Sequence, residues 1–233
     1  MPTQYDVIVI GAGTGGYVAA IRASQLGKKV AVVEKQKALG GTCLIWGCIP
    51  TKALLEHAHA LKIVQHSKEW GISIGESAVA LNMSQVQERK DRIVGGLTKG
   101  VEFLFKKNKI DWIKGTARLT GQGGVDVFEG DVQTLAARKE IIVATGSAPR
   151  SVPGIAIDRT RIITSDEAIH LKEVPKSIVI LGSGAVGVEF ASIFRRFGSE
   201  VTIVELLPRL VPVEDEAVSA ELEKSFRKQG IKV

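Results

Sequence analysis

The feature that most constrains the fold of this chain is a pattern of apolar runs and glycines that occurs twice. In the first copy, the apolar run 7–10 is followed by a glycine-rich loop, a helical pattern to Leu26, and a second apolar run that ends at Glu34. Moving this copy by 171 positions places Gly11, Gly13, Gly16, Gly27, Val30 and Glu34 on Gly182, Gly184, Gly187, Gly198, Val201 and Glu205. The sequence therefore predicts two strand–helix–strand units of one design.

Each copy has the features of a dinucleotide-binding unit of Rossmann-like type. Gly11 allows the tight turn after the strand, and Gly13 allows the backbone to approach a pyrophosphate at the helix N-terminus. The acid at the end of the second strand can accept hydrogen bonds from ribose hydroxyls. A glycine triplet by itself also arises from close helix–strand packing, but here strand, helix, strand and acid all occur in order. We therefore expect an α/β fold with two dinucleotide sites.

The two cysteines of the chain, Cys43 and Cys48, lie just after the first copy, with four residues between them. Pro50 and the helix-forming residues after it predict a helix N-terminus at Cys48, with Cys43 in a loop. The positive end of a helix dipole favours a thiolate there. A structural disulfide and a metal site are the alternatives. We favour a redox-active pair and expect no metal, because no histidine spacing completes a set of four ligands.

The rest of the chain predicts three helices, a small group of strands and a linker over residues 149–175. The expected elements are a helix from Cys48 to about His66, a helix from an N-cap at Ser84 to Lys107, strands at 112–113, 125–128, 132–136 and 141–144, and a short helix at 166–171. The apolar stripe of the long helix is expected to pack in a core. We expect a first domain over residues 1–148, with a small β-meander insertion, and the first part of a second domain over 149–233.

Composition argues against several classes of protein. The formal net charge of +6 and the pI of about 9.3 are compatible with a nucleic-acid partner. However, the lysines and arginines are scattered among acids, so we expect no nucleic-acid partner. Apolar stretches are shorter than the 18 or so residues of a membrane span, so no membrane partner is expected. The N-terminus has no pattern of a signal peptide, and the cytoplasm is the expected compartment.

Two dinucleotides and a dithiol together predict an electron path between a nicotinamide cofactor, a flavin and a disulfide. Glu205 would repel a 2′-phosphate on the ribose, which favours NAD over NADP.

With these residues in place, the chain resembles the pyridine nucleotide-disulfide oxidoreductase family, and within it the dihydrolipoamide dehydrogenase branch. The run Gly40–Leu55 is similar to that branch's redox loop, and Ala144-Thr145-Gly146 is similar to the family's second flavin motif. Ile45-Trp46 departs from the commoner residues of the loop. The resemblance implies oxidation of a dihydrolipoyl dithiol by NAD⁺ through Cys43, Cys48 and FAD, with Cys43 exchanging with substrate and Cys48 lying against the flavin.

The resemblance also implies which residues hold the cofactors. FAD would be held by Gly11, Gly13, Gly16, Glu34, Lys35, Gly41, Thr42, Lys52, Ala117, Ala144, Thr145 and Gly146. Glu189 resembles the family's partner for Lys52. NAD would be held by Gly182, Ser183, Gly184, Ala185, Val186, Gly187 and Glu205.

The family's chains continue for about as many residues again and end in a dimerisation domain that carries a catalytic histidine. We therefore expect this chain to be an N-terminal part with little activity alone, whose parent is a homodimer. The implied partner is a lipoyl-carrying protein of a 2-oxo acid dehydrogenase or glycine cleavage complex. Two alternatives are an NADPH-dependent relative such as glutathione or mercuric reductase, and a non-catalytic flavin- or nucleotide-binding module. A thioredoxin reductase is disfavoured, because its two cysteines are separated by only two residues.

Overall fold

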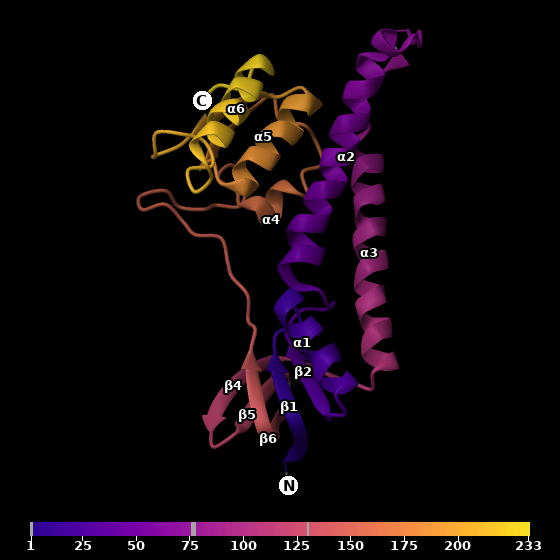
Figure 1. Ribbon diagram of the computed structural model, residues 1–233, viewed down its shortest axis with the longest axis vertical. Helices are drawn as coiled ribbons and strands as arrows, with labels where there is room; N and C mark the ends of the chain where they lie inside the picture. Colours follow the sequence, from indigo (N-terminus) through magenta and orange to yellow (C-terminus); the bar gives the residue numbers. More distant parts are fainter. Residues whose placement is uncertain (1, 76–77, 130) are drawn as a thin grey trace. The chain divides into compact units, whose positions relative to one another are not determined.

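The computed structural model describes residues 2–75, 78–129 and 131–233, whose course is shown in Figure 1. The chain divides into two compact units. The first unit comprises Met1–Pro50 and Arg92–Ala156, and the second unit comprises Thr51–Asp91 and Ile157–Val233. Helices α2 (Cys48–Gln65) and α3 (Met83–Lys107) contribute residues to both units. The domain boundary expected after residue 148 stays a prediction.

The first unit is built on a six-stranded mixed sheet with the order β3-β2-β1-β6-β5-β4. Its elements are β1 (Thr3–Ile10), α1 (Thr14–Gln25), β2 (Val30–Glu34), the π-helical turn η1 (Thr42–Trp46), β3 (Asp111–Lys114), β4 (Thr116–Gly121), β5 (Gly124–Glu129) and β6 (Asp131–Val143). Strand β1 pairs in parallel with β2 and β6, whereas β4, β5 and β6 form an antiparallel meander, visible in Figure 1. The expected α/β fold with a meander is confirmed.

Apolar side chains cover both faces of the parallel strands. On one face, Val7, Val9, Val30 and Val32 pack in a core that includes Phe105 of α3. On the other face, a second core joins Ile8, Ile10, Ala31 and Val33 to Val125, Val127 and Leu135 of the meander. Strands that are buried on both sides have no polar face, which is why 7–10 and 30–33 are unbroken apolar runs.

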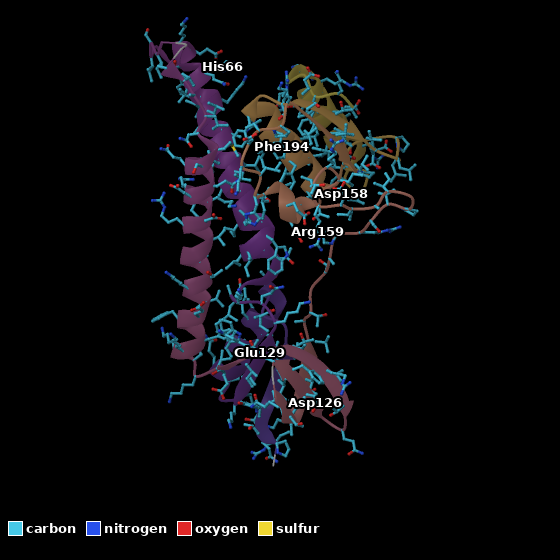
Figure 2. The ribbon with its side chains drawn as sticks, turned by 180° about the vertical axis from the view of Figure 1, so that it is seen from behind. His66, Asp126, Glu129, Asp158, Arg159 and Phe194 are labelled. Carbon is cyan, nitrogen blue, oxygen red and sulfur yellow. The ribbon has the colours of Figure 1, made fainter. Side chains whose placement is uncertain are left out.

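The second unit repeats the strand–helix–strand design. Strand β7 (Ser177–Leu181) pairs in parallel with β8 (Glu200–Val204), and α5 (Ala185–Phe197) joins them. Phe190 and Phe194 of α5 stack with their ring centroids 6.0 Å apart, and Figure 2 labels Phe194 within this helix. The second copy of the pattern is therefore confirmed as a βαβ unit. Helix α6 (Glu216–Lys228) follows it and was not predicted.

One face of the β7–β8 pair differs from its counterpart in the first unit. The register of 171 residues matches Ile8, Ile10 and Val33 to Val179, Leu181 and Val204. The first three are buried against the meander, whereas Val179, Leu181 and Val204 are 63%, 49% and 51% exposed. We call these three residues the uncovered face of β7–β8.

Several local predictions were wrong. The segments 132–136 and 141–144 are not two strands, because β6 runs unbroken from Asp131 to Val143. Strand β4 was not predicted. Ser84 does not cap α3, because the helix begins at Met83 and the Asn82 side chain accepts the hydrogen bond from Gln85 N at 3.2 Å. The stripe of α3 is only partly core, since Leu97 is 43% exposed and Leu104 is 38% exposed.

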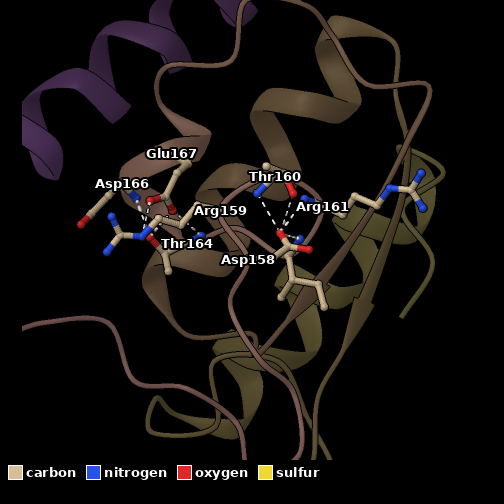
Figure 3. A network of polar contacts seen from close by, with 8 residues as sticks. Asp158, Arg159, Thr160, Arg161, Thr164, Asp166 and Glu167 are labelled. Carbon is tan, nitrogen blue, oxygen red and sulfur yellow. Dashed lines mark hydrogen bonds and ion pairs between the residues drawn. The ribbon is translucent and has the colours of Figure 1, made fainter.

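The linker before β7 is held by two acidic side chains. Asp158 Oδ1 accepts hydrogen bonds from the backbone N–H groups of residues 160, 161 and 162, as Figure 3 shows. These bonds hold the pKa of Asp158 well below its usual range. Glu167 accepts from Thr164 N in a capping box that begins α4 (Ser165–Ala168). The expected helix at 166–171 is therefore present but shorter than predicted.

A buried lysine connects α3 with the end of α4 inside the second unit. Lys90 is 0% exposed, and its Nζ donates to Gln87 Oε1 at 2.5 Å, Ile169 O at 3.0 Å and His170 Nδ1 at 3.0 Å. It also lies 3.1 Å from Asp91 Oδ1. Gln87 Nε2 in turn donates to Leu171 O at 2.9 Å. We call Gln87 and Lys90 with residues 169–171 the α3 clasp.

Among the residues that the structure describes, no helix combines the length and the apolar composition needed to cross a bilayer.

Candidate functional site

The first glycine-rich loop lies at the carboxyl end of β1, between that strand and α1. Gly11 has φ +100°, and a Cβ at Gly11 would lie 2.3 Å from Ala144 O. A Cβ at Gly16 would lie only 1.9 Å from Gly11 O. Strand β1 lies between β2 and β6, so the strand order runs outward from β1 in both directions. The end of β1 is therefore a topological switch point of the sheet. Ligands of open α/β sheets bind at such a point, beyond the carboxyl ends of the strands.

Glu34 fixes the loop to the end of β2. This residue is 8% exposed; its Oε2 accepts from Ala12 N at 2.8 Å, and its Oε1 accepts from Gln36 N at 2.9 Å. The carboxylate therefore stands beside the glycine loop, where ribose hydroxyls of a bound dinucleotide would lie. Ala12 was missed by the sequence analysis, because its contribution is a backbone N–H that any residue could supply.

The second repeat reproduces this geometry. Gly182 has φ +95°, and a Cβ at Gly187 would lie 2.2 Å from Gly182 O. Glu205 Oε2 accepts from Ser183 N and Ser183 Oγ, both at 2.7 Å. Its Oε1 accepts from Leu207 N at 2.9 Å, and these bonds, led by that to Leu207, lower the pKa of Glu205 to about 2. The carboxylate is therefore ionised throughout the physiological range.

The correspondence between the repeats extends beyond the two acids. Gly40 N donates to Ala12 O at 2.9 Å, and Val211 N donates to Ser183 O at 3.0 Å, in the same register of 171. Leu39 and Leu210 are both 0% exposed. The sequence already contained this signal, since Leu39 and Leu210 match in the same alignment.

The two glycine loops differ in what covers them. A Cβ at Gly41 would lie 2.4 Å from Gly13 Cα, so the segment that leads to Cys43 packs directly on the first loop. Around Gly184, the counterpart of Gly13, a Cβ would meet no heavy atom within 4 Å. The first loop is therefore covered by Gly41, and the second loop is open at the corresponding place.

The cysteines lie where the segment 41–47 meets α2. Cys48 is exposed and is the first residue of α2, as predicted. Cys43 is half-buried and lies in the π-helical turn η1, not in the irregular loop that was expected. The turn is tight, because a Cβ at Gly47 would lie 2.7 Å from Thr42 O. Both sulfur-bearing residues thus follow Gly41 within one short, compact segment.

Lys52 and Glu189, two further residues of the predicted site, form an ion pair. Lys52 lies on α2, four residues after Cys48, and its Nζ donates to Glu189 Oε1 of α5. The Lys52 side chain is 55% exposed and that of Glu189 is 28% exposed. The pairing is therefore present within the second unit, whereas the role of either residue toward a flavin stays a prediction.

The remaining predicted site residues are distributed as follows. Ala144 N donates to Ile10 O at 2.8 Å, which holds the start of the Ala144-Thr145-Gly146 turn beside the first loop. Lys35 is exposed, and Ala117 packs in β4 against the core around Leu135. Ala185 and Val186 begin α5, and Val186 is 56% exposed. Among the described residues, no group of three or more His, Cys, Asp or Glu side chains is arranged to hold a metal ion.

Comparison with known proteins agrees with this arrangement. The family described as pyridine nucleotide-disulphide oxidoreductase matches residues 5–233. Dihydrolipoyl dehydrogenase 3 of Pseudomonas putida is 49% identical over 229 residues, which are 98% of this chain and 49% of that protein. Dihydrolipoyl dehydrogenase of Bacillus subtilis is 45% identical over 99% of this chain and 50% of its own length. The chain thus spans about half the length of the curated relatives it matches.

A solved structure is also similar. It is an HOCl-induced flavoprotein disulfide reductase of Escherichia coli, determined as a Cu(II) complex of a cysteine-to-serine mutant. Its TM-score is 0.83 at 29% identity, over 99% of this chain and 48% of that one.

Proposed function

The chain belongs to the pyridine nucleotide-disulphide oxidoreductase family, and we propose that it acts as the dithiol- and dinucleotide-binding part of an enzyme that oxidises dihydrolipoyl groups with NAD⁺. One observation carries this proposal. The segment that bears Cys43 and Cys48 packs through Gly41 directly on Gly13 of a dinucleotide-binding loop. A thiol pair beside a dinucleotide loop is the arrangement that electron transfer between the two requires.

The two loops fit two cofactors with different exchange behaviour. We assign FAD to the first loop, because the segment that carries both cysteines packs on this loop through Gly41, so a flavin bound there would lie beside the thiol pair. Gly11, Gly13, Gly16, Glu34 and the turn at Ala144 would hold it. We assign NAD to the open second loop, from which a cosubstrate can leave after each reaction. Open space beside Gly184 suits the close backbone approach of a pyrophosphate in the second loop.

The proposed chemistry is an exchange between two dithiols. In the oxidised protein, Cys43 and Cys48 share a disulfide bond. A substrate thiolate attacks Cys43 Sγ and releases the Cys48 thiolate, and the second substrate thiolate then displaces Cys43 to close the lipoyl disulfide. The substrate dithiol thus loses two protons to form the attacking thiolates, and two electrons pass to the cysteine pair, whose sulfurs are released as thiolates. When bound, FAD would accept these electrons and pass a hydride to NAD⁺.

The partners and the compartment are part of the same proposal. The relatives' names contain dihydrolipoyl dehydrogenase, which supports a lipoyl-carrying protein of a 2-oxo acid dehydrogenase or glycine cleavage complex as the partner. We further propose a homodimer for the whole protein. The cytoplasm is the compartment that suits a catalytic cysteine pair. It is a reducing environment, so structural disulfides are rare there.

Counting thiols in the purified chain tests the proposed function. After mild oxidation and desalting, a thiol reagent should detect no reactive thiol in the monomer, because both cysteines of the chain are in the disulfide. Dihydrolipoamide, added anaerobically and then removed, should restore both thiols. The variants Cys43→Ser and Cys48→Ser are matched controls and should show one thiol before and after treatment. Two reactive thiols in the oxidised wild-type chain, or no gain with dihydrolipoamide, would show that the redox assignment is wrong.

Glu205 should decide between the two nicotinamide cofactors. The variant Glu205→Arg replaces a repelling carboxylate with a guanidinium that can pair with a 2′-phosphate. A charge-assisted hydrogen bond of about 1.5–3 kcal/mol corresponds to a shift of roughly 10- to 100-fold toward NADPH. Fluorescence titration of the chain with NADH and with NADPH measures the ratio. Glu200→Arg, which makes the same change of charge at the opposite end of β8, is the control. An unchanged ratio in Glu205→Arg would remove Glu205 from cofactor selection.

A further inference from the structure

The loop after β8 carries an arginine at a position where the first repeat has no cation. In the register of 171 residues, Arg209 stands where the first repeat has Ala38. Both repeats nevertheless form the equivalent backbone hydrogen bond. In the first repeat Gly40 N donates to Ala12 O, and in the second Val211 N donates to Ser183 O. The loop therefore takes up its shape without an arginine, and the Arg209 side chain must serve something other than this part of the fold.

Arg209 binds the segment that follows the loop. Its Nη1 donates to Glu216 Oε1 of α6 at 2.5 Å. Its Nη2 lies 3.3 Å from both Pro212 O and Glu214 O, the carbonyls that it binds. One side chain, 35% exposed, thus ties together both ends of the run from Pro212 to the first residue of α6. We call this set of contacts the Arg209 clamp.

The clamp acts on the counterpart of the segment that covers the first loop. In the shared register, Pro212 corresponds to Gly41. Gly41 approaches Gly13 so closely that a Cβ would overlap its Cα, whereas the neighbourhood of Gly184 is open. A proline ring cannot make the approach that Gly41 makes, and the carbonyl of Pro212 is held by Arg209 Nη2.

We propose that Arg209 is a positioning residue that holds residues 212–215 away from the second glycine loop and so keeps that loop open for an exchanging nicotinamide cofactor. This inference rests on the proposed assignment of that cofactor to the second loop. Arg209 itself does not touch the cofactor in this scheme. Its effect is to keep the site organised before binding, so that the cofactor does not have to order the segment itself.

Titration of the chain with NADH and NADPH, followed by fluorescence, tests the inference. Arg209→Ala should weaken NADH binding by about tenfold, the effect expected when binding must order one or two additional residues. NADPH binding should weaken by the same factor, because the clamp is not a phosphate ligand. Arg209→Lys keeps the charge but not the forked geometry, and should be intermediate. Glu216→Gln keeps an acceptor for Nη1 and should bind within about twofold of wild type.

Arg227→Ala is the matched control, because it removes another arginine ion pair, with Glu223, near the end of α6. It should leave both affinities unchanged. Circular dichroism and thermal unfolding show whether each variant is folded, and Arg209→Lys remains informative if Arg209→Ala does not fold.

An Arg209 variant that is folded and binds NADH as the wild type does would overturn the inference about Arg209 and leave the cofactor assignment standing. A loss confined to NADPH would show direct phosphate binding instead. Absence of NADH binding by the wild-type chain would overturn the cofactor assignment and the inference with it.

Discussion

Replacing Gly16 with alanine is expected to lower the free energy of unfolding by about 4 kcal/mol or more, at the upper end of single substitutions. The added Cβ would lie 1.9 Å from Gly11 O and 2.9 Å from Gly11 C, both backbone atoms. Neither atom can move without separating α1 from β1 at the glycine loop. Because the same atoms shape the first dinucleotide loop, FAD binding should be lost together with stability. Urea unfolding followed by circular dichroism, with an FAD titration beside it, measures both effects.

Gly15 provides the matched control for this prediction. It precedes Gly16 in α1, and a Cβ there would meet no heavy atom within 4 Å. Gly15→Ala should therefore leave stability unchanged or raise it by up to about 1 kcal/mol, through helix propensity and lower entropy of the unfolded chain. Equal effects of the two substitutions would mean that the close packing at Gly11 does not decide the stability of the loop.

Replacing Lys90 with alanine should have the second largest effect, a loss of about 3 kcal/mol or more in the free energy of unfolding. The side chain is 0% exposed, so its removal leaves a cavity. Ile169 O and His170 Nδ1 also lose their donor. Lys90→Met keeps most of the apolar volume and should cost less, which separates the cavity from the lost hydrogen bonds. Lys99→Ala, an exposed lysine of the same helix, should have little effect. Equal stabilities of the Lys90→Ala and Lys99→Ala variants would contradict the role of the clasp.

The α3 clasp also makes stability depend on pH. His170 Nδ1 can accept from Lys90 only when the imidazole is neutral, and partial burial, with the charge of Lys90, lowers the pKa of His170. The nearby carboxylates of Asp91 and Asp166 act in the opposite direction. Because the unfolded chain binds the proton more readily, stability should fall as pH decreases below about 6.5, the ordinary value for histidine. His170→Asn keeps an acceptor without titrating and should lose this part of the pH dependence.

The repeated units could be predicted because their sequence pattern and their burial have the same cause. Residues 7–10 and 30–33 are apolar without interruption because the sheet is covered on both faces. The glycines fall where the backbone of one element meets that of another, as at Gly16 and Gly187. Such positions admit one residue type only, so the sequence carries a signal that does not depend on the rest of the fold.

Strand β6 could not be predicted as one element, because its environment changes along its length. Residues up to Ala136 pair with β5, whereas Leu135–Val143 pair with β1. The polar residues Arg138, Lys139 and Glu140 are exposed in the middle of β6. They interrupt the apolar pattern from which a strand is predicted. A sequence window therefore indicates two short strands where the backbone forms one.

Long-range polar contacts were the other part of the structure that the sequence did not predict. Lys90 lies four residues from both Val86 and Val94, so its position on the apolar face was visible, but a lysine normally indicates a solvated surface. For Arg209, nothing in the local sequence indicates its contacts with residues 212–216. For the site, the glycines, acids and cysteines were identifiable by type and spacing. The covering of one loop and the opening of the other follow from packing between segments.

The uncovered face of β7–β8 has a consequence for how the chain behaves in solution. Val179, Leu181 and Val204 present contiguous apolar surface on a two-stranded sheet, of which β7 is an outer strand. Unpaired strand edges beside apolar side chains favour association between molecules. The apparent molecular weight of the chain in light scattering should therefore rise with protein concentration, and titrations are best made at micromolar concentration or below.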